Sequence, residues 1–228
     1  MTPDNTTRRT YKRRRATDLS AINENYDIAS LVANTSIGNR STDNLLAHSF
    51  NKTDQSHTIT SDETLIAPKA LLISRTDQSG IITQCNDVFI AMSGWTKEEL
   101  LGSNHNLVRH PEMPQLIFKL AWDHIKNNKE FYGYFKNIRK DGGFYWVFAY
   151  ITADIDINGA TIGYTSYRRF ASQKTIQVIE PIYKILCKAE KNGGVAVSEP
   201  LLTQYLEKTG FGSYDKFIVD VQLEATPA

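Results

Sequence analysis

The strongest constraint on the fold of this chain is a run of three strand-like segments in its centre. The segments FYGYFKNIRK (131–140), FYWVFAYITADI (144–155) and GATIGYTSYRRF (159–170) are rich in aromatic and β-branched residues, which favour strands. Asp141-Gly142-Gly143 separates the first two, and Ile157-Asn158-Gly159 separates the second pair. Both linkers have the glycine and asparagine chemistry of tight hairpin turns. The pattern therefore predicts three consecutive antiparallel strands.

The residues before these strands predict a hairpin followed by helices. ALLIS (70–74) and IITQC (81–85) flank a polar turn that ends in glycine, which is the pattern of two paired strands. DVFIAMSG begins directly after Asn86, a residue type that caps helices, and stops at Gly94. QLIFKLAWDHIKNN (115–128) has apolar residues at helical spacing. We expect two strands, several short helices and three strands, in that order.

This order predicts an α+β fold built on one sheet. Five antiparallel strands with short helices on one face would enclose a space between the two layers, and such spaces generally bind small molecules. We expect three parts of the chain. They are a disordered polar tail over residues 1–64, the sheet domain over residues 65–171, and a helical extension over residues 172–228.

The expected tail contains a basic cluster, Arg8–Arg15, that carries six positive charges. Residues 1–64 are rich in Ser, Thr, Asn and Asp, so they cannot bury enough apolar surface to offset the entropy of ordering. We expect a solvated cluster; the alternative is a weak electrostatic contact with anionic lipid, nucleic acid or an acidic protein. Because the net charge is only +1, no nucleic-acid partner is expected, and membrane contact is expected only through this cluster.

The residue pattern excludes several classes of protein. The longest apolar run, FYWVFAYITA, is about half of a bilayer span, and no signal peptide opens the chain. Cys85 and Cys187 are too few and too isolated for a disulfide framework or a thiolate metal site. Paired carboxylates, metal-ligand spacing and a nucleophile elbow are absent. We expect a cytoplasmic protein that is not an enzyme.

The stretch VRHPEMPQ (108–115) has two interpretations. In the first, its polar residues and two prolines only start the helix at 115–128. In the second, they form a ligand clamp with little backbone freedom. Arg109 then offers a planar donor fork or a stacking surface, His110 hydrogen-bonds or stacks beside it, and Glu112 orients Arg109 or caps the helix. Residue chemistry alone leaves both interpretations open.

Four other positions suit either the core or a ligand. Phe118 and Trp122 share one face of the helix at 115–128, and periodicity assigns them equally to the core and to a pocket wall. Asn137 falls on the apolar side of its strand, where a buried amide needs a partner. That partner is either a loop backbone or the edge of a ligand. Asn86 has the same two interpretations, as a helix cap or as a ligand contact.

Several motifs resemble those of PAS domains. General PAS signposts are Asn86-Asp87-Val88-Phe89, Gly94-Trp95-Thr96, Glu99-Leu100-Leu101-Gly102 and Asp141-Gly142 before Tyr145-Trp146. More specific motifs resemble the sensor domain of the bacterial aerotaxis (Aer-type) receptor family. They are HNLVRHPEMP, Phe118 with Trp122, KNIRKDGGFYWV, GYTSYRR and IEPIYKIL. The likeness runs from Leu71 to Leu186. Glu112 and Phe131 depart from that family, which usually has Asp and Trp there.

The resemblance implies a fold, a cofactor and a role. Aer-type receptors bind FAD in a PAS domain and report cellular redox state. It implies a PAS fold here, with FAD held by Arg109, His110, Glu112, Phe118, Trp122, Phe131, Asn137 and Asn86. Because the membrane anchor and helical transmitter of those receptors are absent, we expect a stand-alone homodimeric sensor. It would signal redox or respiratory state, as in energy taxis, to a separate chemoreceptor-like or kinase transmitter protein.

Three other functions are alternatives to an FAD-binding redox sensor. A cofactor-free PAS module that dimerises or docks through its sheet face is the alternative function, and Glu112 and Phe131 favour it. A haem PAS needs an axial histidine, but His124 would face away if Trp122 faces the pocket, since residues two apart on a helix differ by about 200°. A light-sensing flavin adduct needs a cysteine in the stretch NHNLVRH, which has none.

Overall fold

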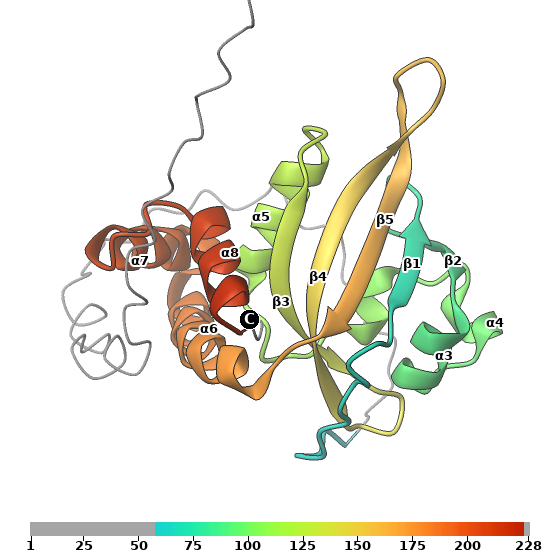
Figure 1. Ribbon diagram of the computed structural model, residues 1–228, viewed down its shortest axis with the longest axis horizontal. Helices are drawn as coiled ribbons and strands as arrows, with labels where there is room; N and C mark the ends of the chain where they lie inside the picture. Colours follow the sequence, from blue (N-terminus) through green and yellow to red (C-terminus); the bar gives the residue numbers. More distant parts are fainter. Residues whose placement is uncertain (1–57, 226–228) are drawn as a thin grey trace, which may run out of the picture.

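The computed structural model describes residues 58–225 and contains a five-stranded antiparallel sheet in the spatial order β2-β1-β5-β4-β3 (Figure 1). The strands are β1 (Leu72–Thr76), β2 (Ile82–Cys85), β3 (Phe131–Ile138), β4 (Phe144–Ile155) and β5 (Thr161–Phe170). The predicted order of elements and the α+β class are confirmed.

Short helices connect β2 to β3 and cover one face of the sheet. They are α3 (Asp87–Ser93), α4 (Lys97–Leu100), the 3-10 helix η1 (His105–Val108) and α5 (Gln115–Ile125). Local chemistry sets their ends. The Asn86 side chain accepts a hydrogen bond from the N–H of Phe89, and Gly94 ends α3 at a φ of 75°, which glycine adopts at little cost. Thr96 and Glu99 form a reciprocal capping box on α4.

The register of the sheet decides which side chains face these helices. Asn137 pairs with Tyr145, and Arg168 lies between Ala149 and Leu72. Directly paired residues project from the same face of an antiparallel sheet, and so do residues two apart along a strand. Asn137, Tyr145 and Arg168 therefore all project from the inner face, toward α3, η1 and α5.

The outer face of the sheet carries a row of tyrosine rings. Tyr132, Tyr150 and Tyr167 lie side by side on β3, β4 and β5, with successive ring centroids 5.0 and 6.0 Å apart. Glu130 accepts hydrogen bonds from the hydroxyls of Tyr132 and Tyr150 at 3.0 and 2.7 Å. Tyr167 is exposed and the other two are half-buried. We call these three residues the tyrosine row.

Three C-terminal helices pack around the β3 edge of the sheet (Figure 1). Tyr214 stacks on Phe131 at the inner side, with 5.7 Å between ring centroids, whereas Gln222 accepts a hydrogen bond from the Tyr134 hydroxyl at 2.6 Å. Tyr183 donates to the carbonyl oxygen of Tyr134 at 2.9 Å. The extension therefore covers an edge strand that would otherwise be open to pairing. Its helices are α6 (Gln173–Gly193), α7 (Val195–Lys208) and α8 (Tyr214–Ala225).

Most of the expected tail, including Arg8–Arg15, lies outside the described residues. The segment from residue 58 runs beside the turn between β3 and β4. The N–H of Thr60 donates to the carbonyl oxygen of Gly142 at 2.9 Å, and that of Thr64 donates to Phe144 at 2.8 Å. The boundary at residue 64 stays a prediction. None of the helices in residues 58–225 combines the length and apolar character that crossing a bilayer requires.

Candidate functional site

Arg109 lies where the loop before α5 meets the edge of the sheet. Its backbone forms an isolated antiparallel bridge with Asn137. Its guanidinium carbon lies 3.9 Å from the centre of the Phe118 ring, and its Nη2 donates to the Met113 carbonyl oxygen at 3.5 Å. Burial lowers the pKa of this guanidinium, and the nearby Glu190 carboxylate opposes that shift. The side chain therefore stacks on α5 as a half-buried cation.

His110 and Glu112 are engaged with other parts of the loop and the sheet. The buried His110 ring accepts a hydrogen bond at Nδ1 from the N–H of Glu112 at 3.1 Å and meets the Phe144 ring edge-on. The Glu112 carboxylate pairs with Nζ of Lys136 at 2.5 Å, and that hydrogen bond lowers its pKa. The expectation that Glu112 orients Arg109 or caps α5 is corrected, because Lys136 occupies its carboxylate.

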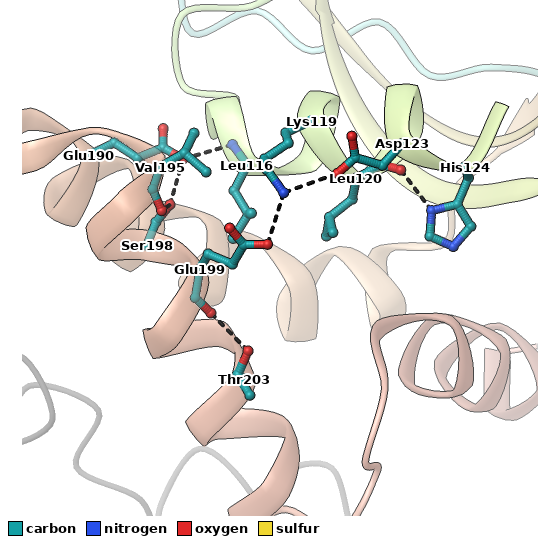
Figure 2. Close-up of polar contacts among 10 residues, drawn as sticks. All are labelled: Leu116, Lys119, Leu120, Asp123, His124, Glu190, Val195, Ser198, Glu199 and Thr203. Carbon is teal, nitrogen blue, oxygen red and sulfur yellow. Dashed lines mark hydrogen bonds and ion pairs between the residues drawn. The ribbon is translucent and has the colours of Figure 1, made fainter. Parts of the chain in front are cut away.

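A different carboxylate caps α5. Glu190 of α6 accepts hydrogen bonds from the N–H groups of Gln115 and Leu116 at 2.7 and 2.8 Å. It also accepts one from the Ser198 hydroxyl of α7 at 3.0 Å, as Figure 2 shows for Leu116 and Ser198. The first N–H groups of a helix have no partner within the helix, and a negative charge there is favourable. The C-terminal extension therefore supplies the cap that was one of the two roles expected for Glu112.

Two further ionic contacts join α5 to the extension. Nζ of Lys119 lies 2.9 Å from Glu199 of α7 and 3.0 Å from Asp123 (Figure 2). Nε2 of His124 lies 3.2 Å from Asp215 of α8, while Nδ1 contacts the carbonyl oxygen of Leu120 at 2.7 Å. His124 thus turns to α8. Along its length, α5 is tied to α6, α7 and α8 in turn.

The opposite side of α5 presents aromatic rings to the inner face of the sheet. Phe118 meets Phe135 of β3 with 5.5 Å between ring centroids, and Trp122 meets Tyr164 of β5 edge-on at 5.4 Å. A Cβ on Gly80 would touch the Trp122 ring at 3.4 Å. Phe118 and Trp122 are only half-buried. They form an aromatic wall beside the stacked guanidinium of Arg109.

A buried polar cluster lies on the inner face beyond this wall. Arg168 is 3% exposed, and its Nη2 donates to Nε2 of His105 at 2.8 Å and to the Ser74 hydroxyl. Its Nε donates to the Ser166 hydroxyl at 3.0 Å. Its guanidinium carbon lies 4.6 Å from the centre of the Phe89 ring. We call Arg168, His105, Ser74 and Ser166 the arginine cluster.

The arginine cluster is rich in hydrogen-bond donors and poor in acceptors. Burial lowers the pKa of Arg168 to about 10, so the group stays charged at neutral pH. Burial and the Arg168 charge lower the pKa of His105 to about 3, so that ring stays neutral. Within residues 58–225 no carboxylate pairs with Arg168, and Nη1 of Arg168 and the buried Tyr145 hydroxyl have no hydrogen-bond partner. Burial raises the pKa of Tyr145 to about 12, so its hydroxyl keeps its proton.

The remaining predicted site residues, Asn137, Phe131 and Asn86, lie in three different environments. Asn137 is buried on the inner face beside Tyr145. Phe131 is fully buried, but its ring stacks on Tyr214 of the extension. The Asn86 amide hydrogen-bonds to the backbone through both its oxygen and its nitrogen: Oδ1 accepts from the N–H groups of Ile73 and Phe89 at 3.0 Å, and Nδ2 donates to the carbonyl oxygen of Leu71 at 2.8 Å.

The structure thus groups four of the eight predicted residues around one region. These are Arg109, Phe118, Trp122 and Asn137. Asn86 serves as a helix cap and strand tie, which is one of the two roles left open for it. Glu112 and His110 contact Lys136 of β3 and Phe144 of β4, and Phe131 contacts the extension.

Comparisons with known proteins identify a PAS fold in the central part of the chain. The sequence model of the PAS fold matches residues 82–168, which contain β2, β3, β4, most of β5, η1 and α5. The aerotaxis receptor of Escherichia coli (strain K12) is 40% identical over 128 residues, 56% of this chain and 25% of the receptor. This chain contains a PAS domain. Its sequence is similar to part of the aerotaxis receptor, as the sequence motifs predict.

Two other proteins are also similar to this chain. The nitrogen fixation regulatory protein of Klebsiella pneumoniae is 27% identical over 106 residues, 46% of this chain and 21% of that protein. The crystal structure of a PAS domain from Colwellia psychrerythraea is 21% identical, covers 45% of this chain and 87% of its own, and has a TM-score of 0.42. The chain spans about a quarter of the length of these two curated relatives.

Sequence reasoning about this PAS domain missed the arginine cluster. Arg168 lies in the motif GYTSYRR, which entered only as part of the resemblance. A signal was available, because Tyr164, Ser166 and Arg168 alternate along β5, which places a charge on the apolar side of the strand. Its partners Ser74 and His105 are distant in sequence, and only the fold brings them to it.

The stability of the PAS domain should fall as the pH drops below 6.5. Burial lowers the pKa of His105 to about 3, and burial with the Lys136 charge lowers that of His110 to about 4. The unfolded chain takes up protons near pH 6.5, whereas the folded chain does not until much lower pH, so acid favours unfolding. Between pH 7 and pH 5, each histidine should cost about 2 kcal/mol of unfolding free energy.

Urea titrations followed by tryptophan fluorescence at pH 7 and pH 5 measure this loss. His105→Asn and His110→Asn should each remove about half of the pH dependence, since each removes one proton-binding group of the unfolded chain. His124→Asn is the matched control. If both test variants keep the wild-type dependence, the two rings are not held neutral by the fold.

Proposed function

We propose that this PAS domain is a cytoplasmic redox sensor that binds FAD between the inner face of the sheet and α5. Its redox state would be signalled through α5 to the C-terminal helices and from there to a separate transmitter protein, such as a chemoreceptor-like protein or a kinase. The observation that carries the proposal is the half-buried aromatic wall of Phe118 and Trp122, together with buried donors of Arg168 and Tyr145 that have no partner among the described residues. The similarity to the aerotaxis receptor supports it.

The residues present fit both ends of such a cofactor. FAD has a flat, largely apolar ring with a polar pyrimidine edge, and it carries an anionic pyrophosphate. Phe118 and Trp122 would contact the ring, and the buried Asn137 amide would bind the pyrimidine edge. Arg109 would bind phosphate through its planar fork or stack on an aromatic group. When bound, the flavin supplies reversible electron uptake.

The chain's own contacts give a route from this region to the C-terminal helices. Asn137 and Arg109 share a backbone bridge, and Arg109 stacks on Phe118 in the first turn of α5. Glu190 holds the N–H groups of that turn. A redox change can bias the output only if the two states interact differently with these groups. A changed hydrogen bond at the Asn137 amide would thus shift Arg109 and the capped end of α5.

Absorption spectroscopy of freshly purified protein tests cofactor binding. We expect flavin bands that are released on denaturation, or uptake of added FAD by the apoprotein. Trp122→Ala and Arg109→Gln should each raise the dissociation constant for FAD by about tenfold or more, because they remove a ring contact or a charge-assisted contact.

The matched control for this titration is Tyr150→Ala in the tyrosine row. It removes a half-buried aromatic ring from the same sheet, but from the outer face, so the affinity for FAD should not change. A colourless wild-type protein that takes up no FAD contradicts the proposal.

The second candidate function is a cofactor-free PAS module that forms homodimers through its sheet. The tyrosine row favours it, because contiguous aromatic rings in contact with solvent are typical of interaction surfaces. In that case Tyr150→Ala should convert a dimer to a monomer in analytical ultracentrifugation, while Trp122→Ala should leave the mass unchanged.

A further inference from the structure

The arginine cluster holds a positive charge that the described part of the protein does not neutralise. Arg168 has five N–H donors. Three are used by neutral acceptors, namely the Ser74 and Ser166 hydroxyls and Nε2 of His105. The two N–H groups on Nη1 are buried and have no partner within residues 58–225. A buried ion without an opposite charge is strongly unfavourable, so this arrangement requires an anionic partner or a strong acceptor.

The cluster is also built to keep the guanidinium in one place. Two of its edges are hydrogen-bonded, and its guanidinium carbon lies over the Phe89 ring, 4.6 Å from the ring centre. The His105 ring stacks on the same Phe89 ring at 5.8 Å, with its acceptor nitrogen turned to Arg168. The free Nη1 edge and the Tyr145 hydroxyl remain as donors on the inner face that also carries Asn137.

We infer that Arg168, with Tyr145, is the counter-charge for reduced, anionic flavin, so that the site binds reduced FAD more tightly than oxidised FAD. This inference rests on the proposed FAD site. Uptake of two electrons and one proton converts the neutral isoalloxazine ring to an anion whose charge lies on its pyrimidine end. The electrons come from a soluble reductant, and the proton comes from solvent. A fixed buried cation stabilises that anion more than the neutral ring.

The inference is tested by measuring two dissociation constants in the full chain. One is for oxidised FAD, and the other is for FAD reduced anaerobically with dithionite. The ratio of the oxidised to the reduced constant should fall at least about tenfold in Arg168→Met, which equals a lowering of the two-electron potential by about 30 mV. Tyr145→Phe should lower the ratio less, because it removes one neutral donor. Arg169→Met is the control, since Arg169 is exposed and neighbours Arg168 in β5.

A second measurement separates ligand recognition from folding. Arg168→Met replaces a buried, unneutralised charge with an apolar side chain of similar length, so the urea midpoint of the apoprotein should stay or rise. If Arg168→Met does not fold, the inference is tested by the ratio of the oxidised to the reduced dissociation constant in Tyr145→Phe. If the wild-type protein binds FAD and both variants have the wild-type ratio, the inference is overturned and the proposed function stands. Wild-type protein that binds neither form overturns both.

Discussion

Replacing Glu190 with alanine should lower the free energy of unfolding by about 3 kcal/mol. One carboxylate satisfies two N–H groups at the start of α5 and the Ser198 hydroxyl of α7. Charge-assisted hydrogen bonds of this kind contribute about 1.5–3 kcal/mol each. Leu116 is fully buried, so its N–H group would be left without a partner and without ready access to water.

The same substitution should separate the first turn of α5 from the C-terminal helices. Hydrogen exchange should become faster at Gln115 and Leu116 and in α7, because Glu190 is the shared acceptor that joins these elements. Equilibrium unfolding in urea and exchange followed by mass spectrometry measure the two effects.

Glu180→Ala is the matched control for Glu190→Ala. Glu180 lies on the same helix and forms a surface pair with Lys184 at 3.3 Å, which contributes about 0.5 kcal/mol or less. If Glu190→Ala is no more destabilising than this control, the cap on α5 is not what holds the extension.

Replacing Gly163 with alanine should destabilise the sheet by about 3 kcal/mol or more. A Cβ at this position would overlap the carbonyl oxygen of Thr76 in β1, and a backbone atom in a paired strand cannot move aside. The pairing of β1 with β5 also places Ser74 opposite Ser166, so a shift there would disturb the arginine cluster. Thermal and urea unfolding measure the loss.

Gly102→Ala provides the control for this prediction. Gly102 has a φ of +81° but open space around its Cα, so alanine there should cost about 1 kcal/mol through backbone strain alone. An equal effect of the two substitutions would show that backbone conformation, and not the close approach to Thr76, explains Gly163.

The order of strands and helices was readable from the sequence because it depends on local chemistry. Asn86 and Gly94 mark the ends of α3 as predicted, and Thr96 with Glu99 caps α4. The glycine turns after β3 and β4 set the hairpins. In each case the decisive residues lie within a few positions of one another, so the pattern contains the information.

The candidate site was only partly readable. Helical spacing put Phe118 and Trp122 on one face, and the structure turns that face to the sheet. Glu112, the acidic residue of the loop before α5, was one candidate for the cap of this helix, but the sequence did not show that Glu190 would cap it instead. Glu190 lies 74 positions after Leu116, and a helix N-terminus accepts any carboxylate that the fold brings within reach.

The sequence by itself determined the order of the strands and helices and the aromatic side of α5, because alternation and capping act over a few residues, and its motifs gave the resemblance to PAS domains. Only the tertiary structure decided that Ser74, His105 and Arg168 meet in one buried cluster. It also decided that the C-terminal helices clamp α5 and stack Tyr214 on Phe131. Those contacts join residues far apart in the chain, and packing, charge and strand register select among partners that local patterns leave equivalent.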